Sequence, residues 1–313
     1  MFSIGVVVNS RAGRKRLRPA IWQRRLERKL GAGDRLWRTT STGDLRAVIA
    51  EFLSAGLDVL AIAGGDGSNH LVLSELIRQA EGRKLPAVAM QCGGTHNAHA
   101  ASLGIRGRPD VLLERILKLR STGRLPVTRR IVLRVQDGKR THHGFSMAAG
   151  FMYRFYEALL GRGSDSTLKV ATTLARWAGS ALFDGTTLDG VFCPCAERLW
   201  LDGERIDFEG VNGVACSAVE RLGMGVRAFP LAGRYADRFH VIATRATPRK
   251  LLQMVPSLWI GRAPRDGDLL SDTAAGIRLE HDSQIGYVLD GELYEGSREL
   301  SISAGPVFSF IKV

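Results

Sequence analysis

A glycine-rich pentapeptide, Gly64-Gly65-Asp66-Gly67-Ser68, follows a short apolar run and leads directly into a segment of helical character. Glycines allow a ligand to approach the backbone closely, and the amides at the start of a helix can bind phosphate oxygens. Asp66 would then hold a magnesium ion that bridges those phosphates. A structural tight turn explains the same five residues equally well. The pentapeptide has neither the spacing of a P-loop nor that of the G-x-G-x-x-G dinucleotide fingerprint.

The first part of the chain alternates apolar strands with helices. We expect strands at 4–9, 35–40, 58–64 and 86–91 and helices at about 17–30, 44–55, 69–80 and 109–120. This alternation predicts a parallel sheet that is covered by helices on both faces. Ligands of such sheets bind beyond the carboxyl ends of the strands. Three polar, glycine-containing loops, at 9–14, 64–69 and 93–97, fall at that edge and predict a binding site there.

From about residue 126 onward the pattern changes to short strands joined by Asp-Gly turns, as in RRIVLRVQDGKRTHHG and RLWLDGERIDFEG. Further strand-like runs occur at 211–219, 239–244, 285–290 and 306–313, with helices at about 151–160, 166–182 and 248–259. We therefore expect an α/β plus β fold. A Rossmann-like parallel α/β domain would occupy residues 1–125, and a mainly antiparallel β-sandwich domain would occupy residues 126–303. The segment from about 304 to 313 either completes the second domain or returns to the first.

The chain is strongly basic, with a formal net charge of +13, which indicates an anionic partner such as nucleic acid, acidic lipid or polyphosphate. Residues 1–30 hold nine Lys and Arg residues against one acidic residue. The apolar spacing in this segment predicts a helix that packs through Leu26 and exposes Arg24, Arg25 and Arg28. That basic face is either simply solvated or attracted to an anionic membrane. No aromatic-basic motif supports specific nucleic-acid binding.

No apolar stretch approaches the roughly 20 residues of a membrane-spanning helix. The apolar run at the N-terminus precedes its charges and is too short for the core of a signal peptide, so it predicts a first strand. We therefore expect a cytoplasmic protein. The four cysteines form neither a zinc pattern nor a dense disulfide framework, and we expect them to be buried free thiols.

Five motifs, in order along the chain, resemble those of the diacylglycerol kinase catalytic domain superfamily, which includes bacterial diacylglycerol kinase-like and sphingosine kinase-like lipid kinases. They are VVVNSRAGRKR, GGDGSNHLVLSEL, GGTHNAHAASLGI, LGMGVRAFPLAGRYADRFHVI and VLDGELYE. Ser68 stands where the family usually has Thr, and His96 and Ala98 replace a Gly and an Asp of the usual Gly-Thr-Gly-Asn-Asp core. In the fourth motif, Asp237-Arg238 replaces the usual Asp-Gly.

The resemblance implies an ATP-dependent, magnesium-requiring lipid kinase that transfers the γ-phosphoryl group to a lipid hydroxyl, diacylglycerol-like or related, at a membrane surface. The nucleotide would be bound by loop residues of the first domain, namely Asn9, Thr40, Gly64, Gly65, Asp66, Gly67, Ser68, Gly94, Thr95 and Asn97. Asp66 would hold the magnesium ion, Asp290 would act as general base, and Glu292 would orient it or assist with the metal. The resemblance also implies that the lipid enters between the domains. We expect peripheral attachment to an anionic membrane, and we leave a homodimer open.

Asp-Gly-Glu occurs twice, as Asp202-Gly203-Glu204 and as Asp290-Gly291-Glu292, and both copies fit type I′ hairpin turns. The second copy lies in the family's C-terminal position, so we predict the catalytic role for Asp290 and a plain turn for Asp202. Two other functions stay open. A kinase of the NAD kinase type, with a water-soluble acceptor, would use the same Gly-Gly-Asp-Gly loop. The departures at His96 and Ala98 suit a non-catalytic protein that binds nucleotide or lipid.

Overall fold

A computed structural model of the chain describes residues 2–10, 24–80, 82–94, 97–138, 140–160, 172, 179–180, 188, 190–222, 226–262 and 266–313, with only the backbone at 159 and 160. The chain divides into two compact units. Unit 1 comprises Met1–Val132, Arg221–Gly225 and Pro306–Val313, and unit 2 comprises Leu133–Glu220 and Val226–Gly305. Each unit therefore draws on more than one stretch of the sequence.

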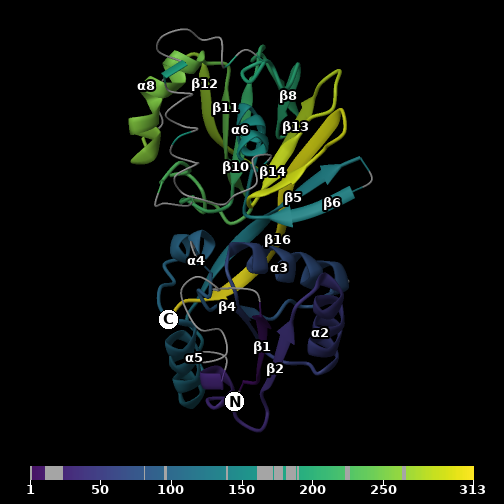
Figure 1. Cartoon of the computed structure of the whole chain (residues 1–313), viewed down its shortest axis with the longest axis vertical. Helices are drawn as coiled ribbons and strands as arrows, with labels where there is room; N and C mark the ends of the chain where they lie inside the picture. Colours follow the sequence, from purple (N-terminus) through teal and green to yellow (C-terminus); the bar gives the residue numbers. More distant parts are fainter. Residues whose placement is uncertain are drawn as a thin grey trace. The chain divides into compact units, whose positions relative to one another are not determined.

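Unit 1 contains a parallel sheet in the order β2-β1-β3-β4 (Figure 1). Its strands are β1 (Ile4–Asn9), β2 (Arg35–Thr39), β3 (Val59–Ala63) and β4 (Ala87–Met90). The last part of β16 (Glu299–Ile311) extends this sheet beside β4, in parallel, with Phe310 opposite Val88. The described helices are α2 (Thr42–Ser54), α3 (Asp66–Ala80), α4 (Ala98–Ser102), α5 (Pro109–Lys118) and the 3-10 turn η1 (Leu119–Ser121). The predicted parallel α/β architecture is confirmed.

Alternate residues of β1 face opposite sides of the sheet and pack against different helices. The even-numbered residues of this strand lie in one buried cluster with Leu113 and Ile116 of α5. On the other face, position 5 must be glycine because a Cβ on Gly5 would lie 2.6 Å from the ring of Phe52 in α2. Both faces of the sheet are thus covered, which leaves the carboxyl ends of the strands for a binding site.

The helix predicted at 69–80 is longer in the structure, because α3 begins at Asp66. The amide of Asn69 donates to the carbonyl of Gly65 at 3.0 Å, which closes a first helical turn over the glycine-rich pentapeptide. Asp66 also places a negative charge in that turn, where the helix dipole favours it. The prediction of a loop over 64–69 is therefore wrong from Asp66 onward, and only Gly64 and Gly65 connect β3 to α3.

The helix predicted from residue 44 also begins earlier, at Thr42, because a capping box precedes it. The hydroxyl of Ser41 accepts a hydrogen bond from the amide of Asp44, and the Asp44 carboxylate accepts from the amide of Ser41. The amide and the hydroxyl of Thr40 donate to the same carboxylate. These donors, with the Thr40 hydroxyl first, lower the pKa of the Asp44 carboxyl from 3.8 to about 2.

Asp44→Asn should lower the melting temperature at neutral pH, and its difference from the unaltered protein should disappear in acid. The folded-state pKa lies below the unfolded value of 3.8, so the stabilisation by the carboxylate is complete above that value and is lost as the pH falls toward about 2. Thermal melts of both proteins across this pH range measure the difference. A difference that did not change with pH would show that the charge of Asp44 does not stabilise α2.

The basic segment near the N-terminus is described only in part. Residues 24–27 are helical, and the side chain of Leu26 is fully buried, as predicted. The three arginines predicted for the outer face are exposed, although Nη1 of Arg25 lies 3.5 Å from the carboxylate of Asp110. Residues 11–23 lie outside the described residues, so the earlier part of this helix stays a prediction. Among the described residues, no helix is long and apolar enough to cross a membrane.

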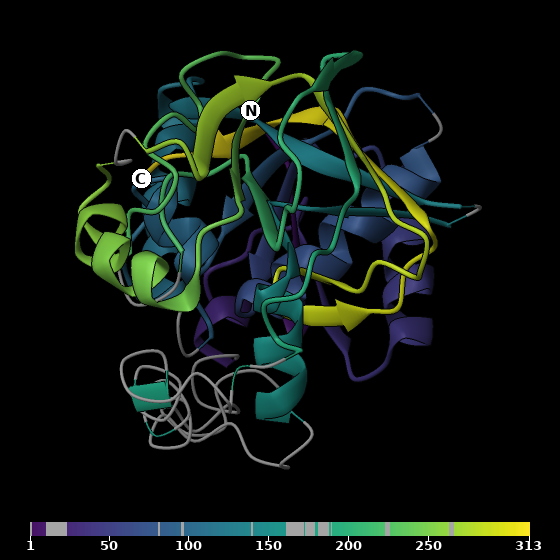
Figure 2. The same cartoon turned by 90° about the horizontal axis from the view of Figure 1, so that it is seen from above.

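Unit 2 consists mainly of antiparallel strands (Figure 2). A six-stranded sheet runs in the order β12-β11-β10-β7-β14-β15, and its strands are β7 (Ser146–Gly150), β10 (Gly213–Ser217), β11 (Phe239–Thr244), β12 (Leu269–Ala274), β14 (Tyr287–Leu289) and β15 (Glu292–Tyr294). The remaining strands, in the same sheet as β16, are β5 (Val127–Asp137), β6 (Arg140–Gly144), β8 (Arg198–Leu201), β9 (Glu204–Ile206) and β13 (Gly276–Glu280). Two labelled helices, α6 (Phe151–Leu160) and α8 (Pro248–Trp259), match predicted ones. Most of the helix predicted at 166–182 lies outside the described residues.

Candidate active site

The two glycine loops predicted at the carboxyl edge of the sheet lie against each other through their backbones. A Cβ on Gly65 would lie 2.9 Å from the Cα of Gly94. The amide of Gly93 donates to the carbonyl of Gly64 at 2.8 Å. None of these four glycines has a positive φ. They are therefore required for the close approach of the two backbones and not for a left-handed conformation.

Gly67 differs from these glycines, because no described atom lies within 4 Å of the place where its Cβ would be. It belongs to the first turn of α3. The amides of Gly67 and Ser68 donate to no acceptor among the described residues. Amides in the first turn of a helix carry the positive end of its dipole and bind phosphate groups. The start of α3 therefore offers both the donors and the open space that a phosphate requires.

Asp66 connects α3 to α4. The amide of Ala98 donates to its Oδ2 at 2.8 Å, and the amide of His99 donates to its Oδ1 at 3.0 Å. Asp66 thus caps the N-terminus of α4. Its Oδ1 also lies 3.5 Å from Nδ1 of His99, whereas Oδ2 has one amide donor and keeps a lone pair that can bind a cation. Burial, with the charge of Asp66 as the next cause, raises the pKa of the Cys92 thiol to about 11, so this neighbouring cysteine is not a thiolate at neutral pH.

Asn97 closes the second loop through two hydrogen bonds to one residue. Its Oδ1 accepts from the amide of Gly94 at 2.9 Å, and its Nδ2 donates to the carbonyl of Gly94 at 3.0 Å. The backbone of Asn97 has a φ of 49°, in the left-handed region that asparagine tolerates better than most residues. Thr95 and His96 lie outside the described residues, so the nucleotide contact predicted for Thr95 stays a prediction.

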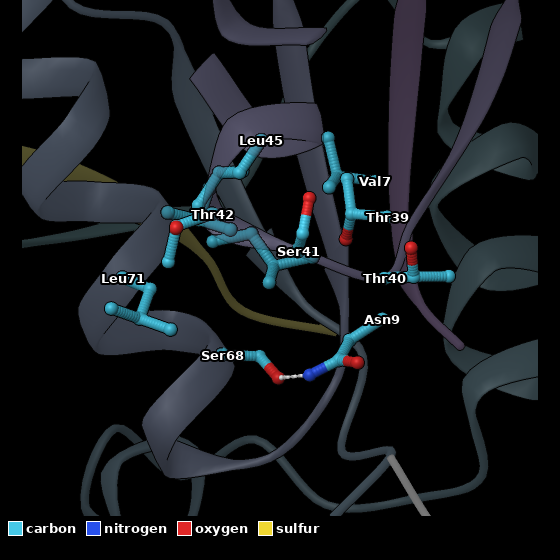
Figure 3. Close-up of a pocket in the computed structure, with 11 residues that line it drawn as sticks. Val7, Asn9, Thr39, Thr40, Ser41, Thr42, Leu45, Ser68 and Leu71 are labelled. Atoms are coloured by element: carbon cyan, nitrogen blue, oxygen red, sulfur yellow. Dashed lines mark hydrogen bonds between the residues drawn. The ribbon is translucent and has the colours of Figure 1, made fainter. Parts of the chain in front are cut away.

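A pocket of about 210 Å³ opens beside these loops, at the ends of β1 and β2 (Figure 3). It is lined by the apolar residues Val7, Leu45, Ile62, Leu71 and Val72 and by the polar residues Asn9, Thr39, Thr40, Ser41, Thr42 and Ser68. The Nδ2 of Asn9 donates to the Oγ of Ser68 at 2.8 Å, which fixes the end of β1 to the first turn of α3. Typical ligand pockets measure roughly 300–1,000 Å³. This pocket therefore suits one part of a nucleotide, such as its base.

The residues that follow β2 contribute more to this pocket than the sequence predicts. Thr40, a predicted site residue, lines the pocket, but its hydroxyl donates to Asp44 at 2.7 Å and so offers a ligand only acceptor lone pairs. Thr39, Ser41 and Thr42 also line the pocket, and they are not among the predicted site residues. The available signal is the run of hydroxyl residues TTST, at positions 39–42, which begins at the last residue of a strand.

Asp290 lies in unit 2, in the two-residue turn between β14 and β15. Its φ is 50° and that of Gly291 is 93°, as a type I′ turn requires. The carboxylate accepts hydrogen bonds of 2.9 to 3.1 Å from the amides of Phe145 and Ser146, which anchors the turn to the start of β7. A Cβ on Gly144 would lie 2.7 Å from Oδ2 of Asp290, so the glycine at this position leaves room for the carboxylate.

Asp202, in the other Asp-Gly-Glu, has nearly the same geometry. The φ values are 52° for Asp202 and 90° for Gly203. The carboxylate accepts from the amides of Ala275 and Gly276 at 2.7 and 3.0 Å, and it also pairs with Arg238. Turn geometry therefore does not distinguish the two copies, since both anchor a hairpin to two successive amides. The two copies differ in one described contact, because the carboxylate of Asp202 forms an ion pair with Arg238.

Glu292 begins β15 and is exposed. Its backbone pairs with Leu289 in the hairpin, but its side chain forms no hydrogen bond or ion pair with a described residue, so the structure shows no bond through which it would orient Asp290. The nearby phenol of Tyr294 has a raised pKa. Burial is the largest cause, and the negative charges of Glu292 and Asp290 are the next ones.

A magnesium site would have to be built largely by a bound nucleotide. Within the described residues, no three His, Cys, Asp or Glu side chains come together as a metal-binding group. Magnesium often keeps several waters and is held by one or two carboxylates together with substrate phosphates. Asp66, whose carboxylate lies in the same helical turn as the unbonded amides of α3, fits this type of site.

Gly67→Ala should leave the fold intact and weaken nucleotide binding, whereas Gly65→Ala should destabilise unit 1. The new Cβ at Gly67 meets no described atom, so a loss of binding would reflect crowding of the ligand. At Gly65 the new Cβ would contact the backbone of Gly94, which can yield only if the loops separate. Calorimetric titration with magnesium-ATP and thermal melts measure the two effects. Unchanged ATP affinity in Gly67→Ala would place the phosphate site elsewhere.

The family model of the diacylglycerol kinase catalytic domain matches residues 3–125. This span includes β1 to α5 and therefore both glycine loops and the pocket. No curated protein matches the chain at a significant level.

Solved structures share the fold over nearly the whole chain. A diacylglycerol kinase from Bacillus anthracis strain Sterne is 16% identical, with a TM-score of 0.66, over 99% of this chain and 97% of that one. Two structures described as putative diacylglycerol kinases from the same strain are 17% identical, with TM-scores of 0.70 and 0.67 and the same coverage. At these identities the similarity establishes the fold, including the second unit.

Proposed function

Since residues 3–125 match the family model of the diacylglycerol kinase catalytic domain, we propose that the chain is a lipid kinase that transfers the γ-phosphoryl group of ATP to a lipid hydroxyl at a membrane surface. The observation that carries this proposal is the start of α3. There the unbonded amides of Gly67 and Ser68 lie in the same helical turn as the carboxylate of Asp66. Amides of this kind bind phosphate oxygens, and a carboxylate beside them can hold the accompanying magnesium ion.

We assign the pocket beside β1 and β2 to the base of the nucleotide. Its apolar residues, such as Val7 and Ile62, can contact an aromatic ring, and its hydroxyls can hydrogen-bond to the polar edge of that ring. Ser68 lines the pocket and also belongs to the first turn of α3. A nucleotide whose base occupies the pocket can therefore place its phosphates at the amides of Gly67 and Ser68.

Phosphoryl transfer depends on positioning and on charge neutralisation more than on covalent chemistry. Magnesium, when bound, supplies part of that neutralisation. In this proposal Asp66 holds the ion, and the α3 amides hold the phosphates. Asp290 accepts the proton of the lipid hydroxyl. Its carboxylate is held in the turn by the amides of Phe145 and Ser146, which fixes its position in unit 2.

We further propose that the protein is cytoplasmic and attaches peripherally to anionic membranes. The net charge of +13 and the exposed arginines of residues 24–28 support an anionic surface as partner. The formation of a homodimer stays a prediction.

A panel of acceptors tests the proposed function. The protein is incubated with magnesium and ATP labelled in its γ-phosphate, and each reaction contains one acceptor: diacylglycerol, monoacylglycerol, a long-chain amino alcohol, glycerol or NAD. Chromatography then identifies the labelled product. Label in a lipid supports the proposal and names the acceptor class. Label in a water-soluble product alone would instead indicate a kinase of the NAD kinase type.

A non-catalytic nucleotide-binding protein is the second candidate, and one observation favours it. Both carboxylates assigned to catalysis, Asp66 and Asp290, already accept hydrogen bonds from two backbone amides. If these bonds are their whole role, the protein would bind magnesium-ATP in a calorimetric titration but label no acceptor in the panel.

A further inference from the structure

Helix α8 carries large apolar side chains on a side that does not pack into unit 2. Met254 is the buried residue of this helix, at 6% exposure. In contrast, Val255 is 41% exposed, Trp259 is 46% exposed and the adjacent Ile260 is 59% exposed. We call these three residues the α8 patch. Val255 and Trp259 are four residues apart and so lie on one side of the helix.

The α8 patch is a local concentration of exposed apolar surface. It contains three of the eight large apolar side chains that are exposed among the described residues. The other five are scattered over separate elements, as is normal for a soluble protein. In both views α8 lies beside β12, the edge strand of the six-stranded sheet, and no described helix or strand of unit 2 covers its side away from β12 (Figures 1 and 2).

The ends of α8 are fixed by local sequence, so the patch is held in place. Thr247 is the N-cap and accepts from the amide of Lys250, and a proline follows at the first helical position. At the other end, the amides of Gly261 and Arg262 donate to the carbonyls of Leu258 and Ser257. Gly261 has a φ of 79°, which completes a Schellman motif directly after the patch.

Two exposed arginines flank the α8 patch. Arg249 and Arg262 are exposed, and neither forms an ion pair with a described carboxylate. The acidic residues Asp266 and Asp268 are already bound by Lys250, at 2.7 and 2.6 Å. Arg249 lies in the first turn of α8, where the helix dipole disfavours a positive charge and no acidic residue compensates it. The helix thus combines exposed apolar residues with basic ends.

We propose that the α8 patch docks on an anionic lipid bilayer, with its apolar side chains in the boundary between headgroups and acyl chains and with Arg249 and Arg262 near lipid phosphates. Amphipathic helices with Trp on the apolar side and basic residues beside it bind membranes in this way. A second copy of the chain fits less well, because it would bring the same positively charged arginines together. This inference rests on the proposed function in one respect, namely that a lipid kinase must reach its acceptor in a bilayer.

Vesicle sedimentation tests the proposal without ATP or acceptor lipid. The full chain should sediment with vesicles of phosphatidylcholine and phosphatidylglycerol and much less with phosphatidylcholine alone. The double variant Val255→Ser, Trp259→Ser should bind the anionic vesicles about tenfold more weakly, because two apolar side chains no longer leave water. The matched control is Val127→Ser, Tyr235→Ser, which removes apolar residues of 46% and 51% exposure elsewhere. Equal binding by the double variant and the unaltered protein would overturn the proposal, as would a lack of binding by the unaltered protein.

Two further measurements exclude other occupants of the patch. Brominated phospholipid should quench tryptophan fluorescence in the unaltered protein but not in Trp259→Phe, which keeps an apolar ring. Quenching that persisted in Trp259→Phe would overturn the proposal. So would a dimer in sedimentation velocity that the double variant abolishes, because a second copy would then cover the patch. Phosphorylation of a short-chain acceptor in detergent should be unchanged in the double variant. If the unaltered protein showed no kinase activity in that assay, the proposed function would be rejected. The vesicle measurements would still test membrane docking independently.

Discussion

Asp66→Asn is expected to lower turnover by about 10³-fold, because a bound magnesium ion contributes several kcal/mol of charge stabilisation to the transition state. Asparagine retains one acceptor oxygen but replaces the other with an amino group that faces a backbone amide, of Ala98 or of His99. The free energy of unfolding should therefore fall by about 1 kcal/mol, the usual loss for a helix cap. The variant should also require more magnesium for its remaining activity. Steady-state rates across a magnesium series and denaturant unfolding measure both effects.

The control for this variant is Asp58→Asn, in the same unit. The Asp58 carboxylate accepts from the amide and the hydroxyl of Ser3 at 2.8 and 3.0 Å, just before the amino end of β3 and away from the glycine loops. It should lose a similar amount of stability and keep its turnover. If Asp66→Asn lost activity only in proportion to its unfolded fraction, Asp66 would be a capping residue and not a metal ligand.

Asp290→Asn is expected to lower turnover by about 10²–10⁴-fold, the contribution typical of a general base, while ATP affinity stays the same. Asparagine tolerates the positive φ of this turn, and its Oδ1 can keep the bonds from the amides of Phe145 and Ser146. It cannot accept the proton of an alcohol. Steady-state kinetics and calorimetric titration with magnesium-ATP separate turnover from nucleotide binding.

Asp202→Asn is a closely matched control, because Asp202 and Asp290 occupy equivalent turns and each accepts from two successive amides. Both variants should change stability by a small amount, with an additional loss at Asp202 from its ion pair with Arg238. Only Asp290→Asn should lose turnover. Equal turnover in the two variants would assign both carboxylates to hairpin anchoring alone.

The elements that depend on apolar periodicity could be predicted from the sequence. The strand at 4–9 and the helix at 248–259 are predicted to the residue, since the apolar run of the former and the Thr-Pro start and Gly end of the latter are local signals. The helices α2 and α3 begin earlier than predicted. The start of α2 has a local signal, the capping box of Ser41 and Asp44, whereas the glycines of the pentapeptide disfavour a helix and obscure the start of α3. The strands β12 and β13, whose hydrogen bonds come from partners distant in sequence, are not among the predicted strands. Neither is β15, which has only three residues and pairs with the neighbouring β14.

For the candidate site, the sequence predicts which loops meet but not how they meet. The carboxyl edge of a parallel sheet brings the loops of β1, β3 and β4 together. The backbone contact of Gly65 with Gly94 and the capping of α4 by Asp66 are tertiary contacts that no local pattern encodes. From the sequence, either Asp-Gly-Glu could be a hairpin turn. In the structure both are turns of the same type.

As a lipid kinase, the chain would transfer a phosphoryl group from ATP to a lipid. Phosphorus NMR tests this transfer most directly, in a reaction that contains the protein, magnesium-ATP and a total lipid extract in mixed micelles. A phosphomonoester signal in the lipid fraction should grow at the same rate as ADP, and both signals should grow about 10³-fold more slowly with Asp66→Asn. ADP that appeared with free phosphate in place of the lipid phosphomonoester, or a spectrum of ATP that did not change, would contradict the assignment as a lipid kinase.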